Sequence, residues 1–256
     1  MRETVVVKCG GSILARLSET FFNSLKELQK TYDLIVVHGG GPEIDMMLKQ
    51  LEIPVQKKEG LRVTTKEVMD VVQMALCGAV NKNLVAKFTK HGMRALGLAG
   101  CDGQLLQAKP YKNQELGFVG EVQGVNVQLL QQLLSLQFVP VLSPVGIDEA
   151  ADLYNINGDT AAAAVASQLQ AKHLLFVTDV PGVLQDGVLI EQADEAMLMQ
   201  LIESGVITGG MIPKVKAALA SLHGQVEKVV IVDGLNGFID NQGKIIGTTV
   251  KKGVAV

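Results

Sequence analysis

The chain has 256 residues, of which 48% are hydrophobic and only 4% aromatic, so its core must be built from aliphatic side chains, as is typical of α/β proteins. The formal net charge of -3 excludes a strong electrostatic attraction to nucleic acid or to an anionic membrane, and no apolar run reaches the ~18 residues of a membrane-spanning helix. We therefore expect small-molecule partners, with no nucleic acid and no membrane.

The first predicted strand covers residues 5–7, ends in Lys8 and is followed at once by Gly10 and Gly11. Three valines in a row favour a strand that is buried on both faces of a parallel sheet. Ligands of open α/β sheets bind at the carboxyl ends of the strands, where glycines let backbone N–H groups approach a phosphate. Lys8 beside this glycine pair fits a phosphate site, and a solvated lysine at a tight turn fits these residues equally well.

A second unit repeats this arrangement. Helical spacing predicts a helix that begins near Ser18, and an apolar run predicts a buried strand over residues 34–37. The strand ends in His38 and three glycines, and a helix follows with Pro42 near its first turn. A glycine run between a strand and a helix is again typical of an anion site. We expect His38 to be a hydrogen-bonded structural residue.

The next two segments are predicted to form a ribbon and a long helix. Residues 54–64 alternate and carry Lys57, Lys58 and Arg62, which indicates a β-ribbon or a lid. Considered alone, these charges would be solvated side chains of the ribbon. Apolar positions at helical spacing predict a helix over residues 65–90.

The middle of the chain is predicted to contain further strands and one helix. Residues 94–98 return as a strand, and residues 100–125 are rich in glycine without a helical period. We expect antiparallel ribbons there, at one edge of the sheet. Asn126 is suited to cap a leucine-rich helix, and residues 138–142 form the next strand.

An alanine-rich helix is predicted over residues 161–169, directly after the polar segment that contains Asp159. Considered alone, Asp159 fits the N-cap position of this helix better than a catalytic role. The same alternation of strands and helices then continues to the end of the chain. We predict strands over residues 173–177, 229–232 and 245–250, and helices over residues 195–203 and after the glycine pair 209–210.

Three glycine clusters, at residues 10–11, 39–41 and 209–210, each lie at a strand end or a helix start and can converge on one crevice. Lys8 and Lys214 accompany two of them, which indicates a site that holds much negative charge, as phosphoryl transfer requires. Neither a Walker loop nor a dinucleotide-binding fingerprint occurs in the sequence.

Six motifs, spread over essentially the whole chain, resemble the amino acid kinase family and, within it, the branch whose substrate is N-acetyl-L-glutamate. Gly158 departs from the family pattern because alanine is usual there, and Ala99 with Cys101 interrupts a usual Ser-Gly-Lys run. The motifs are KCGG at residues 8–11, VHGGGP at 37–42, GLRVT at 60–64, NINGD at 155–159, TDVPGV at 178–183 and GGMIPK at 209–214.

The resemblance implies a three-layer αβα sandwich around a mostly parallel open sheet. It implies a single domain over residues 1–256, with an acetylglutamate-binding lobe over about residues 1–170 and an ATP-binding lobe over about residues 171–256. The implied reaction is ATP-dependent phosphorylation of the side-chain carboxylate of N-acetyl-L-glutamate, in arginine biosynthesis. A carboxylate with a pKa near ~4.3 is already ionised at neutral pH, so this reaction needs no general base.

The resemblance also implies roles for individual residues. Lys8 and Lys214 would stabilise the transferring phosphoryl group and the leaving β-phosphate, and Asp159 would hold both lysines. Mg²⁺ would bridge the phosphates, with no metal ligand assigned to the protein. The substrate side would be formed by Gly40, Gly41, Arg62 and Asn155, and the nucleotide side by Gly10, Gly11, Asp179, Gly182, Gly209 and Gly210.

Two alternatives remain open from the sequence. One is a related kinase that acts on another carboxylate or on a carbamate, and the other is a catalytically silent nucleotide sensor on the same fold. A silent descendant would be expected to lose Lys8, Asp159 or Lys214, and all three are present.

Cysteine usage and the start of the chain lead to expectations about location and assembly. The three cysteines Cys9, Cys77 and Cys101 are widely spaced, which argues against a disulfide framework and for a cytoplasmic protein. Only residues 1–4 precede the first strand, which leaves no room for a signal peptide. Arginine-inhibited members of the family carry an extra N-terminal helix, so we expect a homodimer that is insensitive to arginine.

Overall fold

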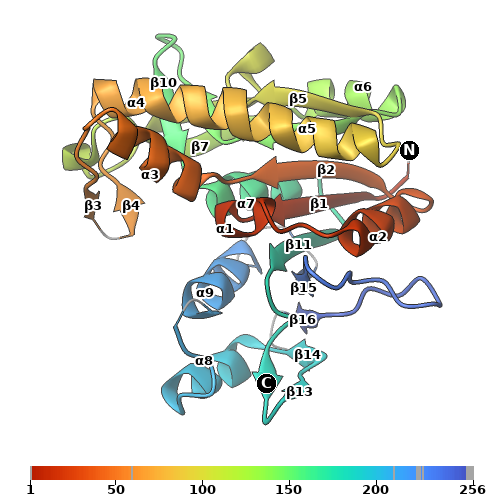
Figure 1. Cartoon of the computed structure of the whole chain (residues 1–256). Coiled ribbons are helices and arrows are strands. Elements are labelled where there is room, and N and C mark those ends of the chain that lie inside the picture. Colours follow the sequence, from red (N-terminus) through yellow and green to blue (C-terminus); the bar gives the residue numbers. More distant parts are fainter. Residues whose placement is uncertain (1, 59, 210, 223–225, 227, 252–256) are drawn as a thin grey trace.

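The computed structural model describes residues 2–58, 60–209, 211–222, 226 and 228–251, and its largest element is an eight-stranded sheet. The strands of this sheet are β1 (Thr4–Cys9), β2 (Asp33–His38), β5 (Ala95–Ala99), β8 (Val139–Ser143), β11 (His173–Thr178), β14 (Gln192–Ala193), β15 (Val229–Asp233) and β16 (Thr248–Val250). Their order is β14-β16-β15-β11-β1-β2-β8-β5, and in Figure 1 the sheet runs from β5 near the top to β14 near the bottom. Neighbours are parallel except β15 and β16, which confirms a mostly parallel open sheet.

Strands β1 and β2 lie in the interior of the sheet, as the valine-rich runs predict. All six residues of β2 are buried, and the three valines of β1 have no exposed surface. Lys8 lies opposite Val37 of β2 and Phe176 of β11. The side chain of Lys8 therefore leaves the sheet near the carboxyl ends of its middle strands.

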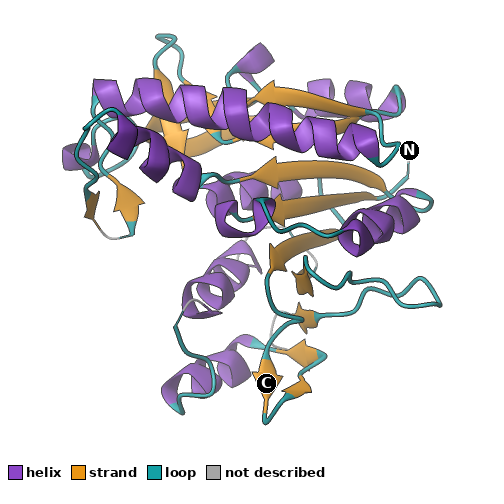
Figure 2. Ribbon diagram, in the orientation of Figure 1, coloured by secondary structure: helices purple, strands orange, loops and turns teal. Residues whose placement is uncertain are grey.

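Helices cover both faces of the sheet, which confirms the three-layer arrangement (Figure 2). Val5 and Val7 face a layer that contains α1 (Gly11–Leu14), α2 (Glu19–Gln29) and α5 (Asn81–Lys90). Val6 faces the other layer. That layer contains α6 (Val127–Ser135), α7 (Gly158–Gln168), α8 (Glu195–Glu203) and α9 (Met211–Leu222).

The long helix predicted over residues 65–90 is present and contains a π-helical segment that we did not predict. Thr65 caps α4 (Lys66–Gln73) by accepting a hydrogen bond from the Val68 N–H. The π-helical segment η1 (Met74–Val80) then connects α4 to α5, and Figure 1 shows one continuous rod. Segments of this kind are frequent at functional sites.

A separate four-stranded sheet closes on itself as a small barrel. It consists of β6 (Leu106–Pro110), β7 (Val119–Val125), β9 (Val145–Ile147) and β10 (Leu153–Ile156). The antiparallel ribbon predicted for residues 100–125 is the pair β6 and β7, but its expected place at an edge of the main sheet is wrong. The two later strands β9 and β10 pair with the ribbon instead, and β5 and β14 form the edges of the main sheet.

The remaining elements are short, apart from one helix. They are α3 (Gly41–Gln50), the hairpin β3 (Lys57–Lys58) with β4 (Leu61–Arg62), the hairpin β12 (Leu184–Gln185) with β13 (Val188–Leu189), and the 3₁₀ turns η2 (Asp102–Gln104) and η3 (Gln114–Leu116). The ribbon predicted for residues 54–64 is the first hairpin. Among the helices of the described ranges, none is long and apolar enough to cross a membrane.

Candidate functional site

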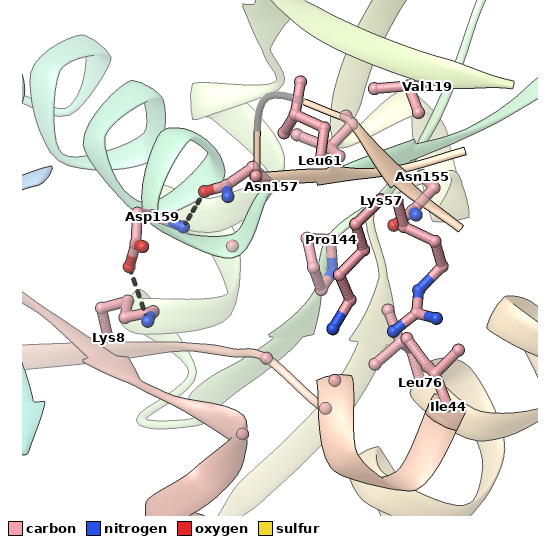
Figure 3. Close-up of a pocket in the computed structure, with 18 residues that line it drawn as sticks. Lys8, Ile44, Lys57, Leu61, Leu76, Val119, Pro144, Asn155, Asn157 and Asp159 are labelled. Carbon is pink, nitrogen blue, oxygen red and sulfur yellow. Dashed lines mark hydrogen bonds and ion pairs between the residues drawn. The ribbon is translucent and has the colours of Figure 1, made fainter. Parts of the chain in front are cut away.

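A polar pocket of about 260 Å³ opens at the carboxyl ends of β1 and β2 (Figure 3). It brings together residues from Lys8 to Asp159, which lie 151 positions apart in the sequence. The predicted site residues that line it are Lys8, Gly11, Gly40, Gly41, Arg62, Asn155 and Asp159. This pocket therefore contains every residue predicted for the substrate side and two of the three predicted catalytic residues.

The floor of the pocket is formed where two glycine loops touch. A Cβ atom added to Gly11 would lie 2.8 Å from the Gly41 nitrogen and 2.9 Å from the Gly40 nitrogen. A Cβ atom added to Gly40 would lie 2.5 Å from Leu76 Cδ2, on the π-helical segment. The approach at Gly11 is to backbone atoms and requires glycine. The two loops place the N-terminus of α3, with its unpaired N–H groups, at the pocket.

Lys8 and Asp159 form an ion pair on one side of the pocket. Lys8 Nζ lies 2.5 Å from Asp159 Oδ1, and the Lys8 side chain is only 14% exposed (Figure 3). The interpretation of Asp159 as an N-cap is wrong, because Asn157 caps α7 and accepts hydrogen bonds from the Asp159 and Thr160 N–H groups. This cap leaves the Asp159 carboxylate available to Lys8.

Arg62 occupies another part of the pocket, where the β3–β4 hairpin meets α3. Its side chain is 8% exposed, and Nη2 lies 2.5 Å from Asp45 Oδ1. Lys57 Nζ lies 3.3 Å from the other oxygen of Asp45. Partial burial tends to raise the pKa of Asp45, but the contact and charge of Arg62, with those of Lys57, outweigh it and lower that pKa. Arg62 Nη1 is buried and has no hydrogen-bond partner within the described part of the chain.

Asn155 connects the barrel to the hairpin. Its Nδ2 donates a hydrogen bond to Thr64 Oγ1 at 3.1 Å, and the Thr64 hydroxyl donates to the Arg62 carbonyl at 2.8 Å. Thr64 is fully buried, so this connection is shielded from water. The side chain of Asn155 is therefore fixed relative to the backbone of Arg62.

A second cluster lies outside the lining of this pocket, between α9 and the loop after β11. Lys214 Nζ donates hydrogen bonds to Thr178 Oγ1 at 2.6 Å and to Asp179 Oδ1 at 2.9 Å. The hydrogen bond from Lys214 lowers the pKa of Asp179. We expected Asp159 to hold both lysines, but Lys214 pairs with Asp179 while Asp159 pairs with Lys8.

The other residues predicted for the nucleotide side lie around these two clusters. Gly10 lies next to the Lys8 ammonium, since an added Cβ would be 3.5 Å from Nζ. A Cβ added to Gly182 would lie 2.5 Å from Thr248 Oγ1, and Gly209 has a positive φ of 53° with open space around it. Gly210 lies outside the described residues.

Three residues of the site were not predicted from the sequence. Asp45 pairs with Lys57 and Arg62 of the hairpin, Asn157 caps α7, and Leu76 packs on Gly40. The cationic cluster at residues 57–62 was a signal that acidic partners exist, but several carboxylates could have filled that role. The position of Asn157 depends on the conformation of the loop before α7, and that of Leu76 depends on the π-helical segment. Neither could be predicted from the sequence.

Cys9, Cys77 and Cys101 are free thiols, as expected. Burial raises the pKa of Cys9 to about 12. In the ranges that the structure describes, no three or more His, Cys, Asp or Glu side chains are arranged to hold a metal ion.

Comparisons with known proteins give consistent results. The sequence profile of the amino acid kinase family matches residues 3–233. The chain is 55% identical to an acetylglutamate kinase of Bacillus cereus (strain ATCC 10987 / NRS 248) over 256 residues, which covers all of both chains.

Solved structures show the same fold. The crystal structure of smu.665 from Streptococcus mutans UA159 is 32% identical with a TM-score of 0.84, and the match covers 98% of this chain and 99% of that chain. Carbamate kinase from Giardia lamblia bound to AMP-PNP is 15% identical with a TM-score of 0.67, and the match again covers 98% of this chain and 99% of that chain. The second likeness concerns the fold alone.

Proposed function

Because the chain belongs to the amino acid kinase family, we propose that its pocket phosphorylates the side-chain carboxylate of N-acetyl-L-glutamate. ATP would be the phosphoryl donor, and the products would be ADP and N-acetyl-L-glutamyl 5-phosphate. Full-length similarity to acetylglutamate kinases supports this substrate, and the reaction belongs to arginine biosynthesis. The enzyme is then a phosphotransferase with a carboxyl group as acceptor.

The buried guanidinium of Arg62 is the observation that carries the proposal. Arg62 keeps one nitrogen, Nη1, without a hydrogen-bond partner in the described chain, and a buried donor of this kind is costly unless a ligand satisfies it. A carboxylate fits a guanidinium with two parallel hydrogen bonds. Arg62 would therefore hold the carboxylate that does not react, and the amide of Asn155 would face the N-acetyl end.

The reacting carboxylate needs no base, so the chain's contribution is charge neutralisation and alignment. Lys8 would neutralise the transferring phosphoryl group, and Asp159 would hold the Lys8 ammonium in place. Lys214, held by Asp179, would act on the leaving side. The backbone N–H groups of Gly11, Gly40 and Gly41 would receive phosphoryl and carboxylate oxygens.

ATP and Mg²⁺ fit the composition of the site. The glycines at residues 10–11, 182 and 209–210, together with Asp179, would form the nucleotide side. Mg²⁺, when bound, would supply positive charge against the nucleotide phosphates.

We also propose a division of labour within the single domain, with acetylglutamate bound by about residues 1–170 and ATP by about residues 171–256. A cytoplasmic homodimer is the assembly we expect, because symmetric dimers are the commonest soluble oligomers. Light scattering of the purified protein checks this expectation: a dimer mass supports it, and a hexamer contradicts it. Inhibition by arginine would contradict the expected insensitivity.

A coupled assay of ADP release tests the function directly, with acetylglutamate, glutamate, aspartate and carbamate compared in parallel. We expect kcat/KM for acetylglutamate to exceed that for glutamate by at least ~100-fold, because the free ammonium of glutamate would be poorly paired in the pocket. Equal turnover of glutamate and acetylglutamate would contradict the assignment. Nucleotide binding without turnover of any acceptor would favour the silent sensor.

A further inference from the structure

His38 and Asn81 form a fully buried pair behind the glycine floor of the pocket, and the reaction described above assigns no role to either. Both residues are 0% exposed. Asn81 Nδ2 lies 3.1 Å from His38 Nε2 and 2.9 Å from the Val141 carbonyl oxygen, while Asn81 Oδ1 lies 3.1 Å from Lys82 Nζ. Burial of such polar groups is costly unless each of them is hydrogen-bonded, and a fully bonded network is rigid.

The neighbours of Asn81 determine which nitrogen of His38 carries the proton. The Val141 carbonyl can only accept a hydrogen bond and the Lys82 ammonium can only donate one, so the amide of Asn81 has one consistent orientation. Its NH₂ group then donates to His38 Nε2, which must accept. The proton of the neutral ring is therefore on Nδ1, and Nδ1 donates to the Gly39 carbonyl at 2.8 Å.

Burial keeps the His38 ring neutral at physiological pH, because it lowers the pKa of His38 to about 4. The hydrogen bond to Gly39 opposes this shift, and the charge of Lys82 adds to it. A group with that pKa cannot exchange protons usefully with a substrate near neutral pH. His38 is thus suited to hold a fixed hydrogen bond.

The hydrogen bond from His38 fixes the orientation of the peptide between Gly39 and Gly40. Trans peptides place the C=O and N–H groups in opposite directions, and the described chain has no cis peptide bond. With the Gly39 carbonyl held by His38, the Gly40 N–H points away from His38. Gly40 lines the pocket, and its nitrogen lies 2.9 Å from the empty Cβ position of Gly11.

Without such a hydrogen bond, a peptide between two glycines can rotate at little steric cost. Rotation would direct a carbonyl oxygen, in place of an N–H group, toward the negatively charged reactants. The Gly39 N–H is already fixed by the Cys9 carbonyl at 2.9 Å, so the next peptide is the part of this loop that depends on His38.

Because of the π-helical segment η1, one helix contacts the loop at residues 38–40 at two positions. Leu76 packs against Gly40, and Asn81 contacts His38, five residues further along. On an α-helix, neighbours on one face are three or four residues apart. The i→i+5 pattern of η1 brings residues five apart toward the same side, and Asn81 is the first residue after it.

We propose that His38 and Asn81 are positioning residues that lock the Gly39–Gly40 peptide so that the Gly40 N–H faces the reacting oxygens. This inference rests on the proposed phosphoryl transfer. His38 and Asn81 act through the peptide and do not touch the reactants.

The test compares two variants of His38 that differ in the position of the side-chain amide. In His38→Asn the side-chain NH₂ takes the place of Nδ1 and can still donate to Gly39, whereas His38→Gln places its amide at the position of Nε2. Loss of one oxyanion donor costs ~10²–10³-fold in kcat. We therefore expect His38→Gln to lose ~100-fold in kcat and His38→Asn less than ~10-fold, with KM for ATP nearly unchanged in both. Equal kcat values of the two variants, at equal thermal stability, would overturn the proposal.

Asn81→Asp provides a second variant of nearly identical size. Its carboxylate accepts from Lys82 but cannot donate to His38 or to Val141, so the ring must carry a proton on Nε2. If the ring of Asn81→Asp is neutral, Nδ1 has lost its proton, and we expect a loss of kcat similar to that of His38→Gln. A ring that carries both protons keeps its hydrogen bond to Gly39 and should keep most of kcat. Wild-type kcat in folded Asn81→Asp with a neutral Nε2–H ring, as read by NMR, would contradict the proposal.

Nitrogen NMR of histidine-labelled protein tests the same inference without any activity measurement. The chain has four histidines, and His38→Asn identifies the His38 signals by their disappearance. We expect the Nδ1–H tautomer in the wild type and Nε2 protonation in Asn81→Asp. An Nε2–H tautomer in the wild type would overturn the inference even if acetylglutamate is phosphorylated. A wild type with the Nδ1–H tautomer and no turnover would contradict only the proposed function.

Discussion

The pocket around Lys8 and the cluster around Lys214 use the same ion-pair chemistry in very different surroundings. Lys8 is on a central strand and 14% exposed, and its partner Asp159, in the first turn of α7, is 33% exposed. Lys214 is 32% exposed, its partner Asp179 is 46% exposed, and both lie near the surface. The charge of Lys8 is therefore fixed by packing, whereas that of Lys214 is screened by water and held by a short contact with a loop.

Loss of either lysine is the largest effect we expect. Lys8→Met and Lys214→Met should each lower kcat by more than tenfold while the fold remains intact, because a lost donor in such a site costs ~3–4 kcal/mol of transition-state stabilisation. Steady-state ADP release and thermal unfolding measure the two quantities. If either variant kept more than a tenth of wild-type turnover, the role assigned to that lysine would be wrong. Only the cluster around the other lysine would then contribute to catalysis.

The two regions should also differ in the pH dependence of stability. The pKa of His38, behind the pocket, is lowered from 6.5 to about 4, so the unfolded chain binds more protons than the folded chain between these values. This contribution to stability is complete above pH 6.5 and is lost as the pH falls, by ~2 kcal/mol at pH 5. Urea unfolding at pH 8 and pH 5 should show a smaller pH effect in His38→Asn than in the wild type.

Protonation of Asp179, in the surface cluster, affects stability with the same sign but in a more acidic range. Its pKa is lowered below 3.8, so its contribution is present above that pH and is lost only in more acidic solution. Asp179→Asn should therefore leave the change between pH 8 and pH 5 as it is in the wild type. An equal pH effect in His38→Asn and the wild type would contradict the account of the pocket side.

Arg62→Lys should separate substrate binding from nucleotide binding. A lysine cannot make two parallel hydrogen bonds to a carboxylate, so we expect KM for acetylglutamate to rise by ~10-fold or more and KM for ATP to change little. Lys214→Arg is the matched control, because it exchanges the same two residue types in the other cluster. A defect of Arg62→Lys that is confined to KM for ATP would place Arg62 on the nucleotide side.

The smallest effect is expected at Gly158, where the family usually has alanine. A Cβ added there would be 3.5 Å from the His38 carbonyl oxygen and 3.8 Å from Lys8 Cε, which are ordinary contacts. Gly158→Ala should change kcat by less than ~2-fold and raise stability by ~0.4–1 kcal/mol. By contrast, Gly11→Ala should abolish activity because its Cβ would lie 2.8 Å from a backbone nitrogen. Equal kcat values in these two variants would contradict the close packing of the glycine loops.

The parts of the fold that local patterns determine could be predicted from the sequence. The valine run of β1 and the capped helix α6, with Asn126 bonded to the Leu129 N–H, are examples. The pairing of β9 and β10 with the ribbon could not be predicted, since these strands are three and four residues long. Their position depends on contacts between distant segments, and short apolar runs carry little periodicity.

The site shows the same division. Lys8 and the glycine loops follow from the order of strand, loop and helix, so their convergence was predictable. The partners were not: Asn157 caps α7 in place of Asp159, and Lys214 pairs with Asp179. Each pairing is decided by a few ångströms of loop geometry, on which local propensity has no bearing.

The acyl phosphate itself is the product that tests the central claim most directly. Hydroxylamine added to the reaction converts an acyl phosphate to a hydroxamate, which can be measured beside ADP, with Lys8→Met as the inactive control. The account predicts one hydroxamate for each ADP released when acetylglutamate is the acceptor. Release of ADP from the wild type with acetylglutamate and no matching hydroxamate would contradict phosphorylation of the side-chain carboxylate.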